Sequence, residues 1–128
     1  MKFLIQVNRP AYGQSTSFQA LSFAKAALAA GHEIISVFFY QDGVLSTNDL
    51  TSPASDEFDL MAAWRDFAET NQVPLINCVS AALRRGVLSS VEAKENLQSH
   101  WNLNPPFIMG GLGELVTGIE KADRVINF

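Results

Sequence analysis

Short apolar runs of strand length recur along this chain, separated by segments of helical character, and this alternation constrains the fold more than any other feature. Residues 2–7 (KFLIQV) and 34–40 (IISVFFY) are nearly continuous in apolar, β-branched and aromatic residues, as is typical of strands buried on both faces of a sheet. We expect five strands, near residues 2–7, 33–40, 74–79, 103–109 and 123–128. Pro105 and Pro106 place the fourth at an edge or at a strand start, because proline cannot donate to a sheet ladder.

Helical signals lie between these runs. Ser15 or Ser17 is expected to cap a helix that runs to about Ala30 and stops at Gly31. Its expected inner stripe comprises Phe18, Leu21, Ala24 and Leu28. Further helices are expected after Ser55 or Asp56, over residues 80–85, after a capping box at 89–92, and after the glycines at 110–113.

Strands that alternate with helices predict an α/β fold, here three α/β/α layers around a mainly parallel five-stranded sheet. A length of 128 residues fits one domain, expected to span residues 1–128. The formal net charge of −4 argues against direct binding to nucleic acid, and no apolar stretch is long enough for a membrane span. A single cysteine cannot form an internal disulfide, and the apolar opening 1–7 is too short for a secretory signal, so we expect a cytoplasmic protein.

Cys78 is that single cysteine, and it lies at the junction of an expected strand and an expected helix. There it would sit close to free backbone N–H groups at the positive end of the helix, an environment that favours the reactive thiolate. Arg84 and Arg85 are expected to add positive potential. The alternative is a buried cysteine that acts as a small apolar residue.

The carboxyl ends of parallel strands meet at one edge of a sheet, where ligands and reactive groups gather. Cys78 lies at that edge, and so do the loops 8–14 and 41–55, so we expect the three to meet. The 41–55 segment reads as a polar loop that is long for a compact domain. In the first loop, Tyr12 is the residue for which we expect a functional role.

Other patterns favour structural explanations. The glycines at 110–113 lack the Lys-Ser/Thr of a phosphate-binding loop and are better explained by a tight backbone approach. His32 and His100 have no cysteine near them in the sequence, so no metal or cofactor is expected. Asp56, Glu57 and Asp59 are explained either as complements of a helix dipole or as an acidic rim on which a partner docks.

Longer segments carry a family resemblance: residues 10–13 (PAYG), 36–40 (SVFFY), 50–60 (LTSPASDEFDL), 78–87 (CVSAALRRGV), 111–113 (GLG) and 123–125 (DRV). In these the chain resembles the TusD-like sulfurtransferase subunits of the DsrE family, and the likeness is weakest over 89–106. The resemblance implies a relay in which Cys78 accepts sulfane sulfur as a persulfide from a TusA-like donor. Cys78 would then pass it to a TusE-like acceptor for 2-thiolation of the tRNA wobble uridine.

The resemblance also implies assembly with TusB-like and TusC-like subunits into a heterohexamer. Trp64 and Phe67 are expected in the core, and the interface is expected near the second strand, the last helix, Trp101 and Phe107. Persulfide transfer resembles thiol–disulfide exchange and requires one accessible cysteine, with no second cysteine in the same chain. Two alternatives remain: DsrE-type sulfur trafficking in dissimilatory sulfur metabolism, and a non-catalytic, flavodoxin-like binding subunit in which Cys78 is only packed.

Overall fold

A single five-stranded sheet organises the chain, in a computed structural model that describes residues 1–128. Its strands are β1 (Lys2–Val7), β2 (Glu33–Phe39), β3 (Leu75–Cys78), β4 (Phe107–Gly110) and β5 (Arg124–Asn127). Their order across the sheet is β4-β3-β2-β1-β5, and every pairing is parallel. The predicted parallel α/β sheet is confirmed.

The fourth strand differs from its predicted bounds, because β4 begins at Phe107 instead of residue 103. The peptide bond between Pro105 and Pro106 is cis, and the strand starts directly after this turn. The prediction from the two prolines, an edge or a strand start, is confirmed, since β4 pairs with β3 alone and begins directly after Pro106.

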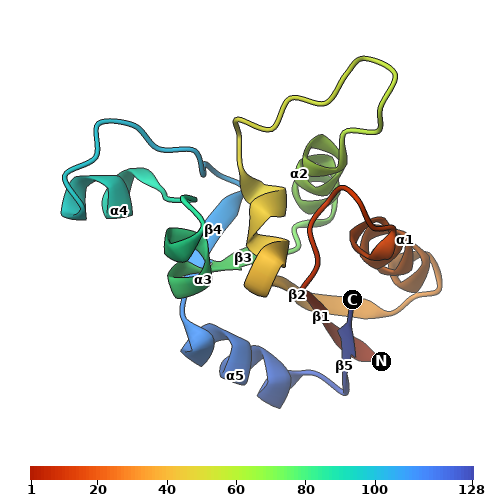
Figure 1. Cartoon of the computed structure of the whole chain (residues 1–128). Helices are drawn as coiled ribbons and strands as arrows, with labels where there is room; N and C mark the ends of the chain where they lie inside the picture. The colour runs from red at the N-terminus through yellow and green to blue at the C-terminus, as the bar shows by residue number, and fades with distance from the viewer.

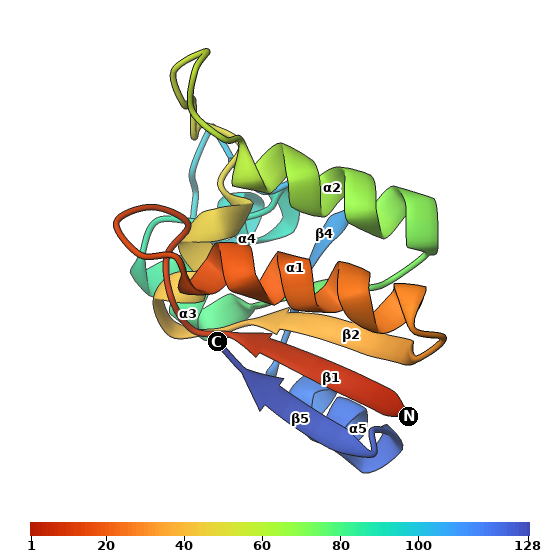
Figure 2. The same cartoon turned by 90° about the vertical axis from the view of Figure 1, so that its right-hand side faces the viewer.

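Helices cover both faces of the sheet. The helices α1 (Thr16–Ala29) and α2 (Leu60–Asn71) lie on one face, and α5 (Leu112–Lys121) lies on the other (Figure 2). Two short helices, α3 (Val79–Arg84) and α4 (Ser90–Glu95), connect β3 to β4 (Figure 1). This is the predicted three-layer arrangement. None of the helices combines the length and apolar character needed to cross a membrane.

The helix α1 confirms the predicted element but corrects its inner stripe. Ser17, Ala20, Leu21, Ala24 and Ala27 are its buried residues, whereas Phe18 is 46% exposed. The buried stripe therefore includes small residues close to the sheet, and the large ring of Phe18 points away from it. Gly31 has a φ of +84° and ends the helix as predicted, in a conformation that glycine adopts without strain.

The helix α2 begins later than predicted. Its N-cap is Asp59, whose carboxylate accepts a hydrogen bond from the backbone N–H of Ala62 at 3.0 Å. Ser55 and Asp56 therefore do not cap it, and Asp56 and Glu57 lie in a turn ahead of the helix. The explanation of all three acids as complements of the dipole of this helix was wrong, because only Asp59 lies at its start.

The core on the α1/α2 face is built from aromatic rings in edge-to-face contact. Phe39 packs against Trp64 at 5.6 Å and against Phe107 at 5.9 Å between ring centroids. Trp64 and Phe67 are buried as predicted. Phe107 is buried as well, so its predicted place in an exposed interface was wrong, and β2 at the centre of the sheet exposes no large apolar side chain.

Among the glycines at 110–113, for which a tight backbone approach is predicted, only Gly110 is closely packed, and its near neighbours are side-chain atoms of Ile76 and Glu114. A Cβ atom there would lie 2.7 Å from Cγ2 of Ile76, closer than real contacts. The absence of a side chain at Gly110 leaves room for the side chains of Ile76 on β3 and Glu114 on α5.

Candidate functional site

Cys78 is the last residue of β3 and the N-cap residue of α3. Its backbone is extended, with φ −64° and ψ 114°, and it pairs in register with Gly110 of β4. The apolar run that forms β3 therefore delivers Cys78 to the carboxyl edge of the sheet, at the strand-to-helix junction predicted from the sequence.

The burial of Cys78 differs from what persulfide chemistry led us to expect. The residue is 2% exposed, and it belongs to the main apolar core together with Ala81 and Ala82 of α3. All four residues of β3 are buried, because the strand has neighbours on both sides and helices above it. A reagent or another protein can therefore reach the thiol only when the structure around it opens.

The segment that packs over this junction is η1 (Gln41–Thr47), a 3-10 helix that contacts β3 and α3. Figure 1 shows η1 beside α3, in front of β3. Gly43, Val44, Ser46 and Thr47 are buried, so the prediction of a plain polar loop was wrong here. Gly43 lies against the end of β1, where a Cβ atom would come within 2.0 Å of the carbonyl oxygen of Val7. Only glycine permits this close approach.

An ion pair joins η1 to α3. Nε of Arg85 donates to the Asp42 carboxylate at 2.8 Å, and its guanidinium also donates to the carbonyl oxygen of Ala81. The side chain of Arg84 is exposed and takes part in neither ion pair of the chain. Neither arginine bonds to Cys78, so the structure assigns Arg85 a role in holding η1, and support of the thiolate by either residue stays a prediction.

The burial of Cys78 predicts slow modification. In the native chain, iodoacetamide should react with Cys78 at least on the order of ten-fold more slowly than in the same chain unfolded in urea, because the thiol reacts only from transiently open states. The measurement is the alkylated fraction over time by intact mass at one pH, with cysteine ethyl ester as a control for the effect of urea. Equal rates in the folded and unfolded chain would contradict the buried placement.

Tyr12 lies with the segment that precedes α2. Its hydroxyl donates a hydrogen bond to the backbone carbonyl of Phe58 at 2.9 Å. Its ring lines one cavity with Phe58 and another with Leu45 and Ser46 of η1. Neither cavity includes Cys78. The loops 8–14 and 41–55 thus meet as predicted. The segment η1 contacts β3 and α3, the two elements that Cys78 joins, but Cys78 shares no cavity with Tyr12.

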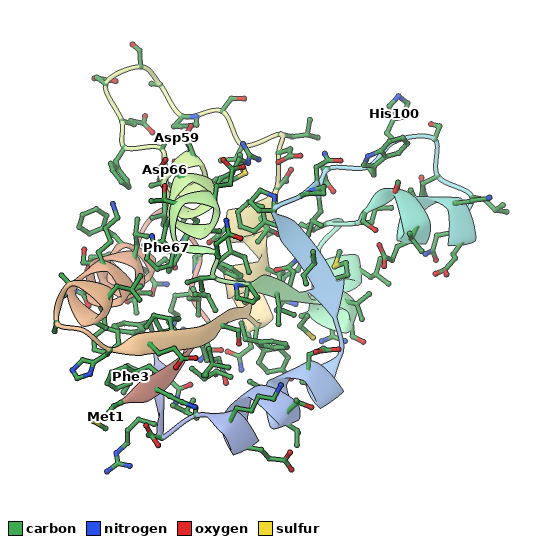
Figure 3. All side chains as sticks on the ribbon, turned by 180° about the vertical axis from the view of Figure 1, so that it is seen from behind. Met1, Phe3, Asp59, Asp66, Phe67 and His100 are labelled. Atoms are coloured by element: carbon green, nitrogen blue, oxygen red, sulfur yellow. The ribbon has the colours of Figure 1, made fainter.

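The three residues of the predicted acidic rim differ in whether their carboxylates are engaged by other groups. Asp59 is engaged as the cap of α2, and Figure 3 shows it at the beginning of that helix. Asp56 and Glu57 are exposed and take part in neither of the two ion pairs of the chain, which join Arg65 to Asp49 and Arg85 to Asp42. The free acidic charge of this rim is therefore that of Asp56 and Glu57.

Asn77, next to the cysteine, is a feature that the sequence reasoning missed. It is fully buried, and neither its amide oxygen nor its amide nitrogen has a hydrogen-bond partner. Such a group is costly to leave unpaired. The available signal was a lone amide inside the apolar run 74–79.

The two histidines lie apart from one another and from the site. The ring of His32 packs edge-on against Phe3, and Figure 3 places His100 on the segment after α4, well away from Met1 and Phe3. No group of three or more His, Cys, Asp or Glu side chains is arranged to hold a metal ion.

Comparison with known proteins gives full-length matches. A model of the DsrE/DsrF-like family matches residues 1–128. The chain is 50% identical to "Sulfurtransferase TusD" of Pectobacterium carotovorum subsp. carotovorum strain PC1, over 100% of this chain and 99% of that protein. It is 49% identical to the protein of the same name from Cronobacter sakazakii, over 100% of both. The crystal structure of the ychN protein from E. coli superposes with a TM-score of 0.79 at 22% identity, covering 100% of this chain and 99% of that one, which supports the fold.

Proposed function

This chain belongs to the DsrE/DsrF-like family, and from that premise we propose that it carries sulfane sulfur as a persulfide on Cys78. The relatives named sulfurtransferase confirm the class of activity expected from the sequence. The observation that carries the proposal is the position of the only thiol, at the carboxyl edge of the sheet and the start of α3.

The chemistry requires no group beyond thiols. The Cys78 thiolate attacks the outer sulfur of a persulfide on the donor, the sulfur–sulfur bond of the donor breaks, and the donor cysteine leaves as a thiolate. A thiolate of the acceptor then attacks the outer sulfur on Cys78, and Cys78 leaves as a thiolate. Each step exchanges one sulfur–sulfur bond for another, so no oxidant or reductant is consumed. A lone thiol suits this role, because no second cysteine in the chain can capture the persulfide as a disulfide.

Movement of η1 is part of this proposal, because Cys78 is buried in the chain alone. Besides its buried residues, the segment is held by the Asp42–Arg85 pair, whose carboxylate is more than half exposed. An exposed pair of this kind contributes on the order of 0.5 kcal/mol, which is small enough for a docking partner to displace.

We assign the roles of the partners by the family resemblance. A TusA-like protein is the proposed donor and a TusE-like protein the proposed acceptor, with the sulfur destined for 2-thiolation of the tRNA wobble uridine. TusB-like and TusC-like subunits are the proposed partners in a heterohexamer. Apolar side chains left exposed on β4 and α5, at Ile108, Leu112, Val116 and Ile119, supply a surface for that assembly.

The test of this function is a reconstituted relay. Persulfide-loaded TusA-like donor, this chain with its partner subunits, and a TusE-like acceptor are mixed, and sulfur on the acceptor is followed by intact mass. Delivery that depends on this chain supports the proposal. A chain that never carries sulfur, while remaining in the assembly, would favour the non-catalytic binding subunit. Delivery to a dissimilatory sulfur carrier in place of the TusE-like acceptor would favour the alternative destination.

The acidic rim yields a prediction about the acceptor. Reversing Asp56 and Glu57 to lysine should slow delivery on the order of ten-fold at low salt, because unpaired rim charges steer association more than they hold a complex. Loading of Cys78 from a small persulfide should be unchanged. The measurement is the rate of delivery as a function of salt concentration.

Reversal of Glu69, an exposed acid in the last turn of α2, provides the matched control and should leave delivery unchanged. Asp59 is left intact in this experiment, because replacing it removes the cap of α2. An unaltered rate and salt dependence in the double reversal would place the docking surface elsewhere.

A further inference from the structure

An aromatic cleft opens beside the acidic rim. It has a volume of about 330 Å³ and is lined by Ala11, Tyr12, Phe18, Glu57, Phe58 and Leu60. We call these six residues the aromatic cleft. Figure 2 shows that the loop after β1 and the loop before α2 project from the same end of the molecule, where α1 and α2 begin.

The rings of the cleft hold one another in place. Phe18 and Phe58 meet edge to face, with 5.2 Å between centroids, and the Tyr12 hydroxyl bonds to the carbonyl oxygen of Phe58 at 2.9 Å. Yet Tyr12 is 41% exposed, and Phe58 is 52% exposed. Grouped aromatic rings that stay open to solvent are typical of surfaces that bind another protein. The cleft is therefore formed before any partner arrives.

The charge around the cleft indicates what binds there. Glu57 forms part of its wall, Asp56 is the preceding residue, and neither takes part in an ion pair. No lysine or arginine lines the cleft. A cation close to Glu57 would also face aromatic rings, which attract positive charge. The surface thus complements a segment that combines an apolar side chain with basic neighbours.

A second cavity connects the aromatic cleft to η1. Ala11 and Tyr12 also line this second cavity of about 190 Å³, which reaches Leu45 and Ser46 of η1. The hydroxyl of Ser46 is buried without a hydrogen-bond partner. This second cavity therefore lies between the aromatic cleft and η1, the segment that contacts β3 and α3 on either side of Cys78 in the sequence.

From these observations we propose that the aromatic cleft receives an aromatic or aliphatic side chain from a basic segment of the protein that accepts sulfur from Cys78. This proposal rests on the proposed function and adds the anchoring contact and its chemistry. The acidic rim attracts the segment, and the cleft then holds the apolar side chain.

The first test measures transfer. Phe58→Ala removes one wall of the cleft, and Ala11→Leu fills it. Each variant, loaded with sulfur, is mixed with increasing concentrations of the TusE-like acceptor in single-turnover experiments. We expect the acceptor concentration for half-maximal rate to rise on the order of ten-fold, because a single aromatic anchor commonly contributes this much. Release of the same sulfur to dithiothreitol, which needs no docking, should be unchanged.

Leu97→Ala is the matched control, since Leu97 is 94% exposed and does not line the cleft. It should deliver sulfur as the wild-type chain does. Thermal unfolding of each variant verifies that the fold is retained. Delivery by both cleft variants with unchanged dependence on acceptor concentration would overturn the proposal. It would also be overturned if the isolated chain formed an oligomer that Phe58→Ala dissociates, because the occupant of the cleft would then be a second copy of this chain.

The second test does not depend on sulfur transfer. A synthetic peptide with the sequence Lys-Phe-Lys, blocked at both ends, is titrated into the isotope-labelled chain, and amide resonances are followed by NMR. We expect saturable shifts at Tyr12, Phe18 and Phe58, and at least ten-fold weaker binding of Lys-Ala-Lys and of Glu-Phe-Glu. Failure of the wild-type chain to load sulfur, with these shifts present, would contradict the proposed function alone. Absence of shifts at the cleft would overturn the cleft proposal.

Discussion

Replacing Cys78 with serine should reduce both loading and delivery of sulfur to background while leaving the fold intact. The hydroxyl of serine cannot form a persulfide under these conditions, and the chain has no second thiol to substitute for it. Serine is nearly isosteric and is a favourable N-cap residue, which is the position that Cys78 occupies in α3. The loss of stability should therefore be on the order of 1 kcal/mol.

The measurement is the reconstituted transfer reaction, with circular dichroism and thermal unfolding as controls for the fold. Cys78→Ala serves as a second variant, because it removes the thiol without placing a hydroxyl in the core. Full delivery by either folded variant would exclude Cys78 as the carrier.

Gly43→Ala should be the most destabilising single change near the site. The added Cβ would lie 2.0 Å from the carbonyl oxygen and 2.7 Å from the carbonyl carbon of Val7, so the backbone of η1 or β1 must shift. We expect a loss of about 3 kcal/mol in the free energy of unfolding, at the upper end of overpacking effects. Because η1 packs on β3 and α3, its displacement should also increase the rate at which iodoacetamide alkylates Cys78.

Urea unfolding and alkylation under native conditions measure the two effects. Gly113→Ala is the matched control, since a Cβ there meets nothing within 4 Å and the residue lies in α5. It should leave stability equal or raise it by up to about 1 kcal/mol. Equal stability of the two variants would contradict the close packing of η1 against β1.

The sheet was predictable from the sequence because its strands are nearly pure apolar runs. The nearly continuous apolar residues of β1 and β2 predict strands that are buried on both faces of the sheet. The parallel order of the strands follows from the helices between them. The fourth strand was placed too early because its leading residues are held by other contacts: Asn102 and Leu103 donate their backbone N–H groups to the carbonyl oxygen of Leu88.

Errors at the site arose where several residues compete for one structural role. Ser55, Asp56 and Asp59 are all residue types that cap helices well, so the local sequence does not distinguish among them, and in the structure the cap is Asp59. Phe18 was assigned to the core because it is large and apolar, but small residues on the neighbouring stripe approach the sheet more closely. The burial of η1 arises from contacts with segments distant in the sequence, among them the close approach of Gly43 to Val7, and no local pattern encodes these contacts.

The position of Cys78 was predictable, whereas its burial was not. A strand that ends in a cysteine before a helical segment fixes the residue at the edge of the sheet. Its burial arises from tertiary contacts of β3 and α3, and one of the segments that contact them is 41–47, for which the sequence predicts a loop. A local sequence pattern therefore predicts where the thiol lies, whereas only the tertiary structure shows how accessible the thiol is.

The most direct test of the central claim is the intact mass of this chain after incubation with a persulfide-loaded TusA-like donor. The wild-type chain should gain the mass of one sulfur atom, lose it on treatment with dithiothreitol, and yield the added sulfur on the peptide that contains Cys78. A chain that stays folded with its partners and gains no reducible sulfur, or gains it at another residue, would contradict the proposed function.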